Sequence, residues 1–270
     1  MKLQDKVIVV TGAGSGMGRE VVVDLLRRGA RVAAVDMRDD TLHQTASLVD
    51  AGDRLSLHVA DVTDRAAVEA LPGAVEAHHG VVDGFVHCAG IIQPFVRLAA
   101  LDYDVIDRVI QVNLYGTIHM VKAFLPRLLT RPEAHIANIS SMGGFLPVPG
   151  QAMYGATKAA VKLMTEALYA EILETNVGVS VVMPGAVATN ITTNSGVDMP
   201  APDGEGAGMT ALPAADAARI ILDGIERDRL YILVGNDAKL MWFAERAAPK
   251  QAIHLIQRQM KALLPDDDVS

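Results

Sequence analysis

Tyr154 and Lys158 stand four residues apart in the segment Tyr-Gly-Ala-Thr-Lys, and Ser141 lies thirteen residues before the tyrosine. Residues four apart share one face of a helix, so the phenol and the ammonium can point at the same site. A tyrosine hydroxyl normally keeps its proton up to a pH of about 10. A neighbouring cation favours the phenolate. We therefore expect Lys158 to lower the pKa of Tyr154 and to make it a usable acid or base near neutral pH.

A glycine-rich motif opens the chain, where residues 11–18 read Thr-Gly-Ala-Gly-Ser-Gly-Met-Gly. It follows an apolar run at 7–10 and precedes a segment at 19–28 that has apolar residues at helical intervals. Strand, glycine turn and helix in this order predict a site for a dinucleotide. Without side chains the backbone can approach the pyrophosphate, and the helix N-terminus attracts its charge. A second apolar run at 31–35 ends at Asp36, about where an acid can bind a ribose 2′-hydroxyl. The alternative for Asp36 is a solvated carboxylate at a strand end.

Together these motifs resemble those of the short-chain dehydrogenase/reductase family, over roughly residues 5–235. Asp61-Val62 is similar to the family's adenine-contacting pair, and Ala89-Gly90 is similar to the end of its fourth strand. Pro184-Gly185 with Thr189 is similar to its nicotinamide-side motif. The family usually has Asn-Asn-Ala-Gly where this chain has His87-Cys88-Ala89-Gly90. We expect that departure to affect local stability more than chemistry.

The resemblance implies the members of the catalytic and cofactor sites. The catalytic tetrad would be Asn113, Ser141, Tyr154 and Lys158. The cofactor contacts would be Gly12, Ser15, Gly16, Met17, Gly18, Asp36, Met37, Asp61, Val62, Ala89, Gly90, Tyr154, Lys158, Pro184, Gly185, Val187 and Thr189.

Each member of the tetrad has an expected role. Tyr154 exchanges the proton of the alcohol oxygen, and Ser141 hydrogen-bonds that oxygen. By resemblance, Lys158 also binds the nicotinamide ribose and Asn113 holds a water that links Lys158 to solvent. Without the resemblance, Asn113 would be read as an ordinary polar residue of a helix. The spacing to Tyr154 favours Ser141 over Ser140, which we expect to be structural.

The cofactor is expected to be NAD, with NADP as the alternative. The carboxylate of Asp36 accepts a hydrogen bond from a free 2′-hydroxyl but repels a 2′-phosphate. Ser15 in the glycine loop is uncharged, and Arg38 follows the acid instead of replacing it.

Few residues bear on the substrate. Residues 190–211 are rich in glycine and proline, and we interpret them as a lid that orders on binding, the alternative being an ordinary surface loop. The expected substrate contacts are Gln93, Phe95, Leu146 and Val148, with Ser141 and Tyr154. The first four carry no charge. They favour a neutral, fairly hydrophobic secondary alcohol or its ketone.

Apolar and amphipathic segments alternate along the chain. Strands are expected at about 54–59, 82–88, 135–140, 179–183 and 230–234, besides the first two. Helices are expected at about 40–50, 64–79, 102–130, 153–175 and 214–228. The alternation predicts an α/β fold: one Rossmann-like, doubly wound parallel sheet of about seven strands, in a single domain over 1–270. Residues 236–264 are expected to form a helical C-terminal extension with a basic side, packed on the core or a neighbouring subunit; binding to a membrane surface is the weaker alternative.

Composition narrows the class of protein. The 270 residues carry a net charge of −8, and no cluster of basic residues suggests nucleic-acid binding. One cysteine, the absence of a signal-peptide pattern and the absence of a long apolar run favour a cytoplasmic protein. No histidine spacing suggests a metal site. By family resemblance we expect a homodimer or homotetramer.

Three functions remain open. The favoured one is an NAD-dependent alcohol dehydrogenase or ketone reductase. The second is an NADP-dependent carbonyl or 3-oxoacyl reductase on the same fold. The third is a sensor that binds NAD without turnover, against which the presence of both Tyr154 and Lys158 argues.

Overall fold

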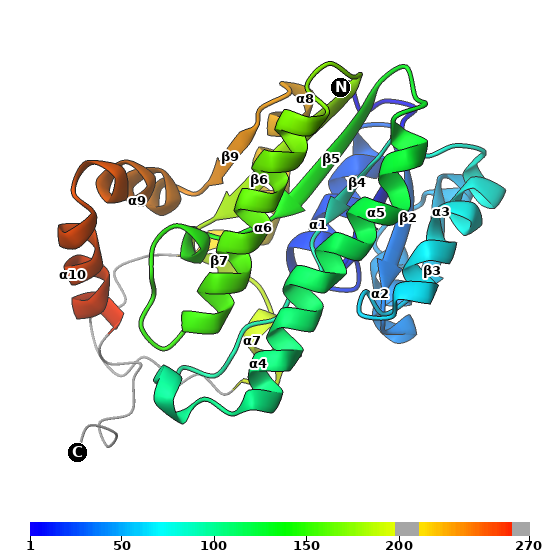
Figure 1. The fold of residues 1–270 in the computed structure, drawn as a ribbon. Helices are drawn as coiled ribbons and strands as arrows, with labels where there is room; N and C mark the ends of the chain where they lie inside the picture. The colour runs from blue at the N-terminus through cyan, green and yellow to red at the C-terminus, as the bar shows by residue number, and fades with distance from the viewer. Residues whose placement is uncertain (198–210, 261–270) are drawn as a thin grey trace.

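A seven-stranded parallel sheet forms the centre of the computed structural model, which describes residues 1–197 and 211–260 (Figure 1). In spatial order its strands are β3 (Leu55–Val59), β2 (Arg31–Asp36), β1 (Val7–Thr11), β4 (Gly84–His87), β5 (Ala134–Ile139), β6 (Val177–Pro184) and β9 (Tyr231–Val234). The chain starts at β1, moves outward to β3, returns beside β1 as β4 and then moves outward to β9. This is the doubly wound order, so the predicted fold class is confirmed.

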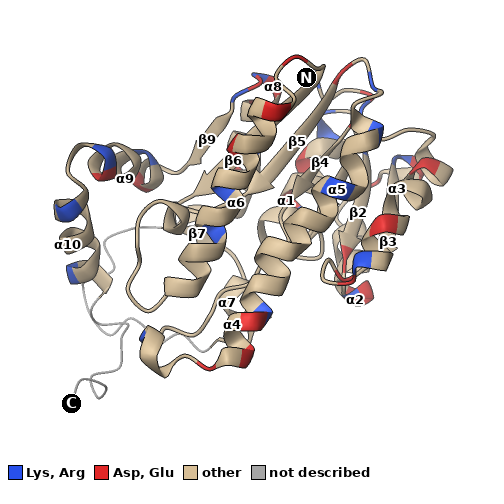
Figure 2. Cartoon of the chain, viewed as in Figure 1, with Lys and Arg blue, Asp and Glu red and all other residues tan. Residues whose placement is uncertain are grey.

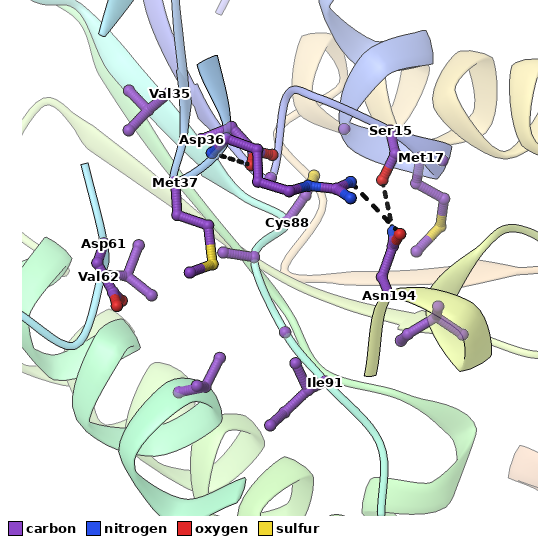
Figure 3. A pocket seen from close by; sticks show the side chains of 18 of the residues that line it. Ser15, Met17, Val35, Asp36, Met37, Asp61, Val62, Cys88, Ile91 and Asn194 are labelled. Atoms are coloured by element: carbon purple, nitrogen blue, oxygen red, sulfur yellow. Dashed lines mark hydrogen bonds between the residues drawn. The ribbon is translucent and has the colours of Figure 1, made fainter. Parts of the chain in front are cut away.

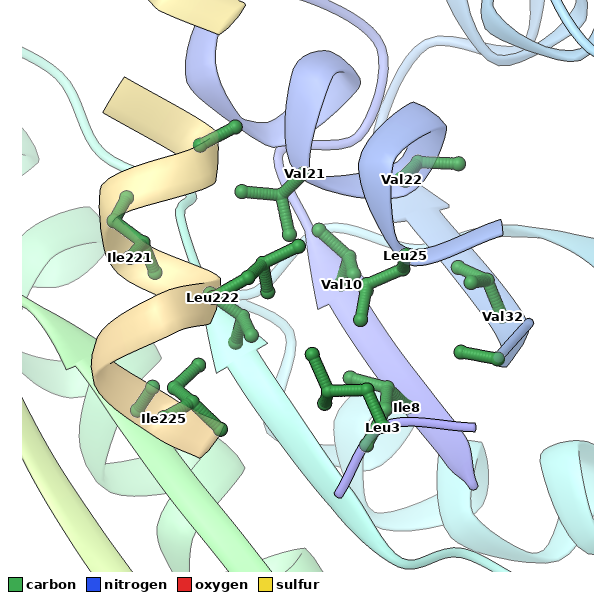
Figure 4. Packing of buried hydrophobic residues seen from close by; sticks show 14 of the residues in the cluster. Leu3, Ile8, Val10, Val21, Val22, Leu25, Val32, Ile221, Leu222 and Ile225 are labelled. Atoms are coloured by element: carbon green, nitrogen blue, oxygen red, sulfur yellow. The ribbon is translucent and has the colours of Figure 1, made fainter. Parts of the chain in front are cut away.

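Helices cover both faces of the sheet. One face carries α1 (Gly16–Arg27), α2 (Asp39–Ala46) and α8 (Ala214–Glu226), and the other carries α3 (Arg65–His79), α5 (Gly116–Leu128) and α6 (Ala152–Glu171). Strand β1 alternates between the two cores: Val10 packs among α1 and α8 (Figure 4), whereas Val9 packs on the other side. A central parallel strand buried on both faces explains why its sequence is continuously apolar.

The predicted strands and helices of the sheet are all present, with ends shifted by a few residues. The helix expected at 102–130 contains a feature that was not predicted. It consists of α4 (Tyr103–Ile110), a π-helical turn at Gln111–Tyr115 and α5. Such a turn inserts one residue into the helix and frequently occurs at functional sites. Here the turn contains Asn113.

After β6 the chain forms several short elements and then the C-terminal helices. β7 (Val187–Ala188) pairs with β8 (Leu212–Pro213), and α7 (Ile191–Ser195) follows β7. Of the predicted lid, residues 198–210 lie outside the described residues.

The C-terminal extension consists of α9 (Asn236–Ala247) and α10 (Pro249–Met260), so its helical character is confirmed up to residue 260. Both helices carry Lys and Arg side chains (Figure 2). Ala252 and Ile256 of α10 are buried, as expected of an amphipathic helix packed on the core. Within 1–197 and 211–260, no helix is both long and apolar enough to cross a membrane.

Candidate active site

The glycine loop joins β1 to α1, and two of its positions require glycine. Gly12 has a φ of 66°, and a Cβ there would lie 2.9 Å from the backbone nitrogen of Ala89. A Cβ on Gly18 would overlap the carbonyl of Gly12. The backbone of the loop therefore lies directly against the end of β4 and the first turn of α1, which leaves its outer side free for a ligand.

Asp36, at the end of β2, is held by two backbone donors. Its Oδ2 accepts a hydrogen bond from the nitrogen of Gly14 at 2.9 Å, and its Oδ1 accepts one from the nitrogen of Arg38 at 3.1 Å. The carboxylate is therefore fixed beside the glycine loop. A carboxylate has about four lone-pair positions, so both oxygens keep capacity to accept from a ligand hydroxyl.

A cavity of about 670 Å³ lies at the carboxyl ends of the strands (Figure 3). Its lining includes twelve of the predicted cofactor residues: Gly12, Ser15, Gly16, Met17, Gly18, Asp36, Met37, Asp61, Val62, Ala89, Gly90 and Thr189. The volume is in the range of sites for small molecules and cofactors. The glycine loop, the acid at the end of β2 and a cavity of this size together fit a dinucleotide.

Lys158 connects this cavity to the predicted catalytic residues. A Cβ on Gly90, which lines the cavity, would lie 3.2 Å from the Nζ of Lys158 and 3.2 Å from the Oδ1 of Asn113. The same ammonium lies 5.9 Å from the ring centroid of Tyr154. Tyr154, Lys158 and Asn113 are thus brought together behind the end of β4.

The Nζ of Lys158 donates a hydrogen bond to the carbonyl of Ile139 at 3.0 Å. Burial lowers the pKa of Lys158 to about 8, because the charged form loses its hydration. Burial raises the pKa of Tyr154 above its ordinary value, and the hydrogen bond with Ser141 only partly offsets this. The expected lowering of the Tyr154 pKa by Lys158 is therefore wrong for the protein alone, since the loss of hydration is the largest effect on this pKa.

Ser141 follows β5 and begins a 3-10 turn at Met142–Gly144. Its Oγ accepts a hydrogen bond from the nitrogen of Gly143 at 3.0 Å, which orients the hydroxyl. The hydroxyl of Ser140 is buried and donates to the carbonyl of Lys158 at 2.7 Å. This contact agrees with the structural role expected of Ser140.

Asn113 is buried within the π-helical turn. Its Oδ1 accepts from the nitrogen of Ile91 at 2.9 Å, and its Nδ2 donates to the carbonyl of Ile91 at 3.0 Å and to the hydroxyl of Thr157 at 3.2 Å. The amide therefore fastens the segment after β4 to α6. Its implied contact with a water stays a prediction.

Two of the predicted substrate residues are fully buried. The Oε1 of Gln93 accepts from the nitrogens of Met153 and Tyr154 at 2.9 Å each, and its Nε2 donates to the carbonyl of Gly150 at 2.9 Å. Leu146 packs against the C-terminal helices. With no exposed surface, both side chains have a structural role in this structure. Gln93 satisfies free N–H groups at the start of α6, as a capping residue does.

Phe95 and Val148 are partly buried, and their expected contact with the substrate stays a prediction. Val148 packs against the cluster that contains Leu146.

The nicotinamide-side motif lies at the end of β6. The nitrogen of Ala186 donates to the Oδ2 of Asp237 at 2.7 Å, and a Cβ on Gly185 would overlap the same carboxylate. Five of the predicted cofactor residues do not line the cavity, and their contact with a cofactor stays a prediction: Tyr154, Lys158, Pro184, Gly185 and Val187.

Several lining residues were not predicted. Arg108, Gln111 and Val112 reach the cavity from α4 and the π-helical turn, and Asn190, Ile191 and Asn194 reach it from α7 and the residue before it. The spacing of the first three places them on one helix face. Nothing in the sequence indicates what that face contacts.

The model of the short chain dehydrogenase family matches residues 6–199, which is more than half of the chain. The chain belongs to the short-chain dehydrogenase family. It is 37% identical over 248 residues to SadH of Mycobacterium tuberculosis, whose name assigns it only provisionally to the oxidoreductases; the match covers 87% of this chain and 88% of SadH.

Two solved structures are similar over most of their length. A short chain dehydrogenase from Burkholderia cenocepacia in complex with NADP has a TM-score of 0.79 at 26% identity, covering 94% of this chain and 98% of that one. A short-chain dehydrogenase/reductase from Burkholderia phymatum in complex with NAD has a TM-score of 0.78 at 26% identity, covering 100% and 99%. This short-chain dehydrogenase is therefore similar to proteins that bind either cofactor.

In this short-chain dehydrogenase, the His87 and Cys88 that replace the usual pair of asparagines lie at the end of β4. The Nδ1 of His87 and the Oγ1 of Thr11 are hydrogen-bonded at 2.8 Å, and the nitrogen of Ala89 donates to the same hydroxyl at 3.1 Å. Burial lowers the pKa of His87 to about 3 and raises that of Cys88 to about 12. His87 thus joins β4 to β1 as a neutral imidazole. Cys88 lines the cavity as an unreactive thiol.

Proposed function

We propose that this protein is an NAD-dependent oxidoreductase that interconverts a neutral, fairly hydrophobic secondary alcohol and its ketone. The observation that carries the proposal is the position of the Lys158 ammonium. It lies between the wall of the dinucleotide cavity at Gly90 and the ring of Tyr154. Lys158 thereby lies next to both the cavity that fits the cofactor and Tyr154, the proposed proton-transfer residue.

A bound nicotinamide dinucleotide would accept the hydride in oxidation and supply it in reduction. The residues of the chain handle the proton and the oxygen. Tyr154 takes the hydroxyl proton of the alcohol as its carbon loses the hydride, and it returns the proton in the reverse direction. Ser141, oriented by Gly143, hydrogen-bonds the oxygen while charge develops on it.

Lys158 is assigned two roles in this reaction. As a cation its ammonium would partly offset the effect of burial on Tyr154 by favouring the phenolate. It lies behind the cavity wall at Gly90, from where we expect it to donate to ribose hydroxyls. Asn113 does not need to touch the substrate, since it acts through the segment after β4 and through α6.

NAD is favoured over NADP by the fixed carboxylate of Asp36. A 2′-phosphate placed beside it would meet like charge. Arg38 also lines the cavity, which supports NADP as the second candidate. However, its Nη2 contacts the Oδ1 of Asn194 at 3.4 Å.

The neutral substrate class is supported by the segment after Ser141. Met142, Phe145 and Val148 are apolar and partly buried, and the C-terminal helices pack behind them.

We also propose that the protein forms a homodimer or homotetramer. Three large apolar or aromatic side chains are exposed on α4, the π-helical turn and α6, where a second subunit could cover them: Tyr103, Tyr115 and Leu163. Sedimentation velocity would measure this assembly, and a monomer would contradict it.

The first experiment compares the unaltered protein with Tyr154→Phe in NAD-dependent oxidation of a panel of neutral secondary alcohols. The variant keeps the ring and removes the proton-transfer group, so we expect turnover to fall by about 100-fold or more. Binding of NADH, followed by its fluorescence, should be retained. Turnover that survives the substitution would remove Tyr154 from the reaction. Tight NADH binding without turnover by the unaltered protein would favour the sensor.

A further inference from the structure

Trp242 is the only tryptophan of the chain, and it is buried where α9 meets the sheet and the segment after Ser141. It packs with Val181 and Met183 of β6. Its ring lies 5.4 Å from the ring of Tyr231 on the edge strand β9, and the guanidinium carbon of Arg246 lies 3.2 Å from its centroid. The indole is therefore held in place by the sheet on one side and by a stacked cation of its own helix.

The side chain of Trp242 also contacts the active-site segment. Its ring meets that of Phe145 edge to face, with 5.0 Å between centroids and 83° between planes. Edge-to-face pairs are directional, so they fix an orientation as well as a distance. The next residue, Leu146, is fully buried against Met241 of α9 and against Ala252 and Ile256 of α10. The C-terminal helices thus hold two consecutive residues that directly follow the Met142–Gly144 turn.

The opposite side of that turn lies against α6 at the proposed catalytic residues. A Cβ on Gly144 would lie 2.9 Å from the carbonyl oxygen of Lys158, and one on Gly143 would lie 3.4 Å from Cε1 of Tyr154. The turn is therefore confined between α6 and the C-terminal helices. The nitrogen of Gly143, which hydrogen-bonds the Oγ of Ser141, belongs to this confined turn.

We propose that Trp242 is a positioning residue of the reaction. Through Phe145 it holds the Met142–Gly144 turn against α6 and so keeps the hydroxyl of Ser141 in register with Tyr154. The inference rests on the proposed function for its effect on turnover, but the packing that it describes can be measured without turnover.

Trp242→Ala tests the proposal, with Phe243→Ala as the matched control. Phe243 is the neighbouring aromatic residue of the same helix and is 69% exposed. We expect Trp242→Ala to lower kcat about 10-fold on the best alcohol substrate, because small misplacements of reacting groups are costly. KM should change less than kcat. The dissociation constant of NADH should be unchanged, because Trp242 does not line the cavity.

Rescue separates positioning from general destabilisation. Trp242→Phe keeps an aromatic ring for the contact with Phe145 and should restore most of kcat. Phe145→Leu keeps the apolar bulk of the other partner and should reproduce the loss in kcat. This variant tests the same contact if Trp242→Ala does not fold. The loss in kcat when both partners are replaced should be no larger than in either single variant. A kcat of Trp242→Ala or Phe145→Leu equal to that of Phe243→Ala would overturn the proposal.

Hydrogen exchange of the peptide covering 141–150 provides a measurement that is independent of any substrate. Exchange should be faster in Phe145→Leu than in the unaltered protein, and unchanged in Phe243→Ala. If the unaltered protein oxidises no alcohol but this exchange pattern holds, the proposed function fails and the packing role of Trp242 stands. Unaltered exchange in Phe145→Leu would overturn the positioning role whatever the reaction is.

Discussion

The carboxylate of Asp36 stabilises the protein and is available to a ligand at the same time. The nitrogens of Gly14 and Arg38 hold it at the rim of the cavity, and it terminates β2. Both donors are backbone groups, so the position of the carboxylate depends on the backbone conformation of the glycine loop and of the turn after β2. A fixed negative charge of this kind discriminates between a ribose hydroxyl and a ribose phosphate.

Asp36→Asn should therefore weaken NAD more than NADP. A hydrogen bond to a charged group contributes about 1.5–3 kcal/mol, so we expect the dissociation constant of NADH to rise about 10- to 100-fold. The dissociation constant of NADPH should stay level or fall, since the repulsion is removed. Asp39→Asn removes the same charge from an exposed position three residues further on and is the control. Equal losses for both cofactors would contradict a role of Asp36 in selectivity.

At the level of secondary structure, α7 bridges parts of the cavity that are distant in sequence. The Nδ2 of Asn194 donates to the Oγ of Ser15 at 2.8 Å (Figure 3). Its Oδ1 accepts from the guanidinium of Arg38 at 3.4 Å. The buried Ser195 accepts from the nitrogen of Ile92 at 3.0 Å, which fastens the helix to the segment after β4. The start of the predicted lid is thus joined to the glycine loop and to the end of β2.

Asn194→Ala should accelerate the release of NADH. Removing a hydrogen bond of about 1 kcal/mol corresponds to about a 5-fold faster dissociation, which stopped-flow displacement would measure. Thr193→Ala, at the exposed preceding position of the same helix, is the control. If both variants release NADH at the rate of the unaltered protein, α7 does not retain the cofactor.

At the scale of the whole molecule, three buried histidines should make the stability depend on pH. Burial lowers the pKa of His79 to about 4 and the pKa values of His87 and His135 to about 3. A histidine in an unfolded chain titrates near about 6.5, so below that pH the unfolded state binds more protons than the folded state. The free energy of unfolding should therefore fall as the pH falls from about 6.5 toward 4.

His87→Asn should reduce this acid sensitivity, and it introduces the residue that is usual in the family. Between pH 7 and pH 5 the unaltered protein should lose about 2 kcal/mol more free energy of unfolding than the variant, measured by urea unfolding. The comparison uses the change with pH, so a constant loss of stability in the variant does not affect it. Identical pH dependence for His87→Asn would show that His87 does not titrate as its burial implies.

The fold was predictable because its signals are local. The continuous apolar runs of β1 and β2, the glycine motif between β1 and α1, and the helical periodicity of α1 and α8 each reflect contacts that repeat along a few residues. The pairing of Tyr154 with Lys158 was predictable for the same reason, since both lie on one helix. The π-helical turn at Asn113 has no comparable periodic signal. The sequence predicted only one continuous helix there.

The amino-acid sequence by itself determined the family, the parallel sheet and twelve of the residues that line the cavity. Only the tertiary structure decided what those residues contact. Gln93 satisfies the start of α6 from about 60 positions earlier in the chain, and Asn194 reaches Ser15 across 179. Trp242 lies against a segment that follows Ser141. Such contacts depend on how whole helices and strands pack, and packing depends on shape and volume rather than on any spacing that a chain displays locally.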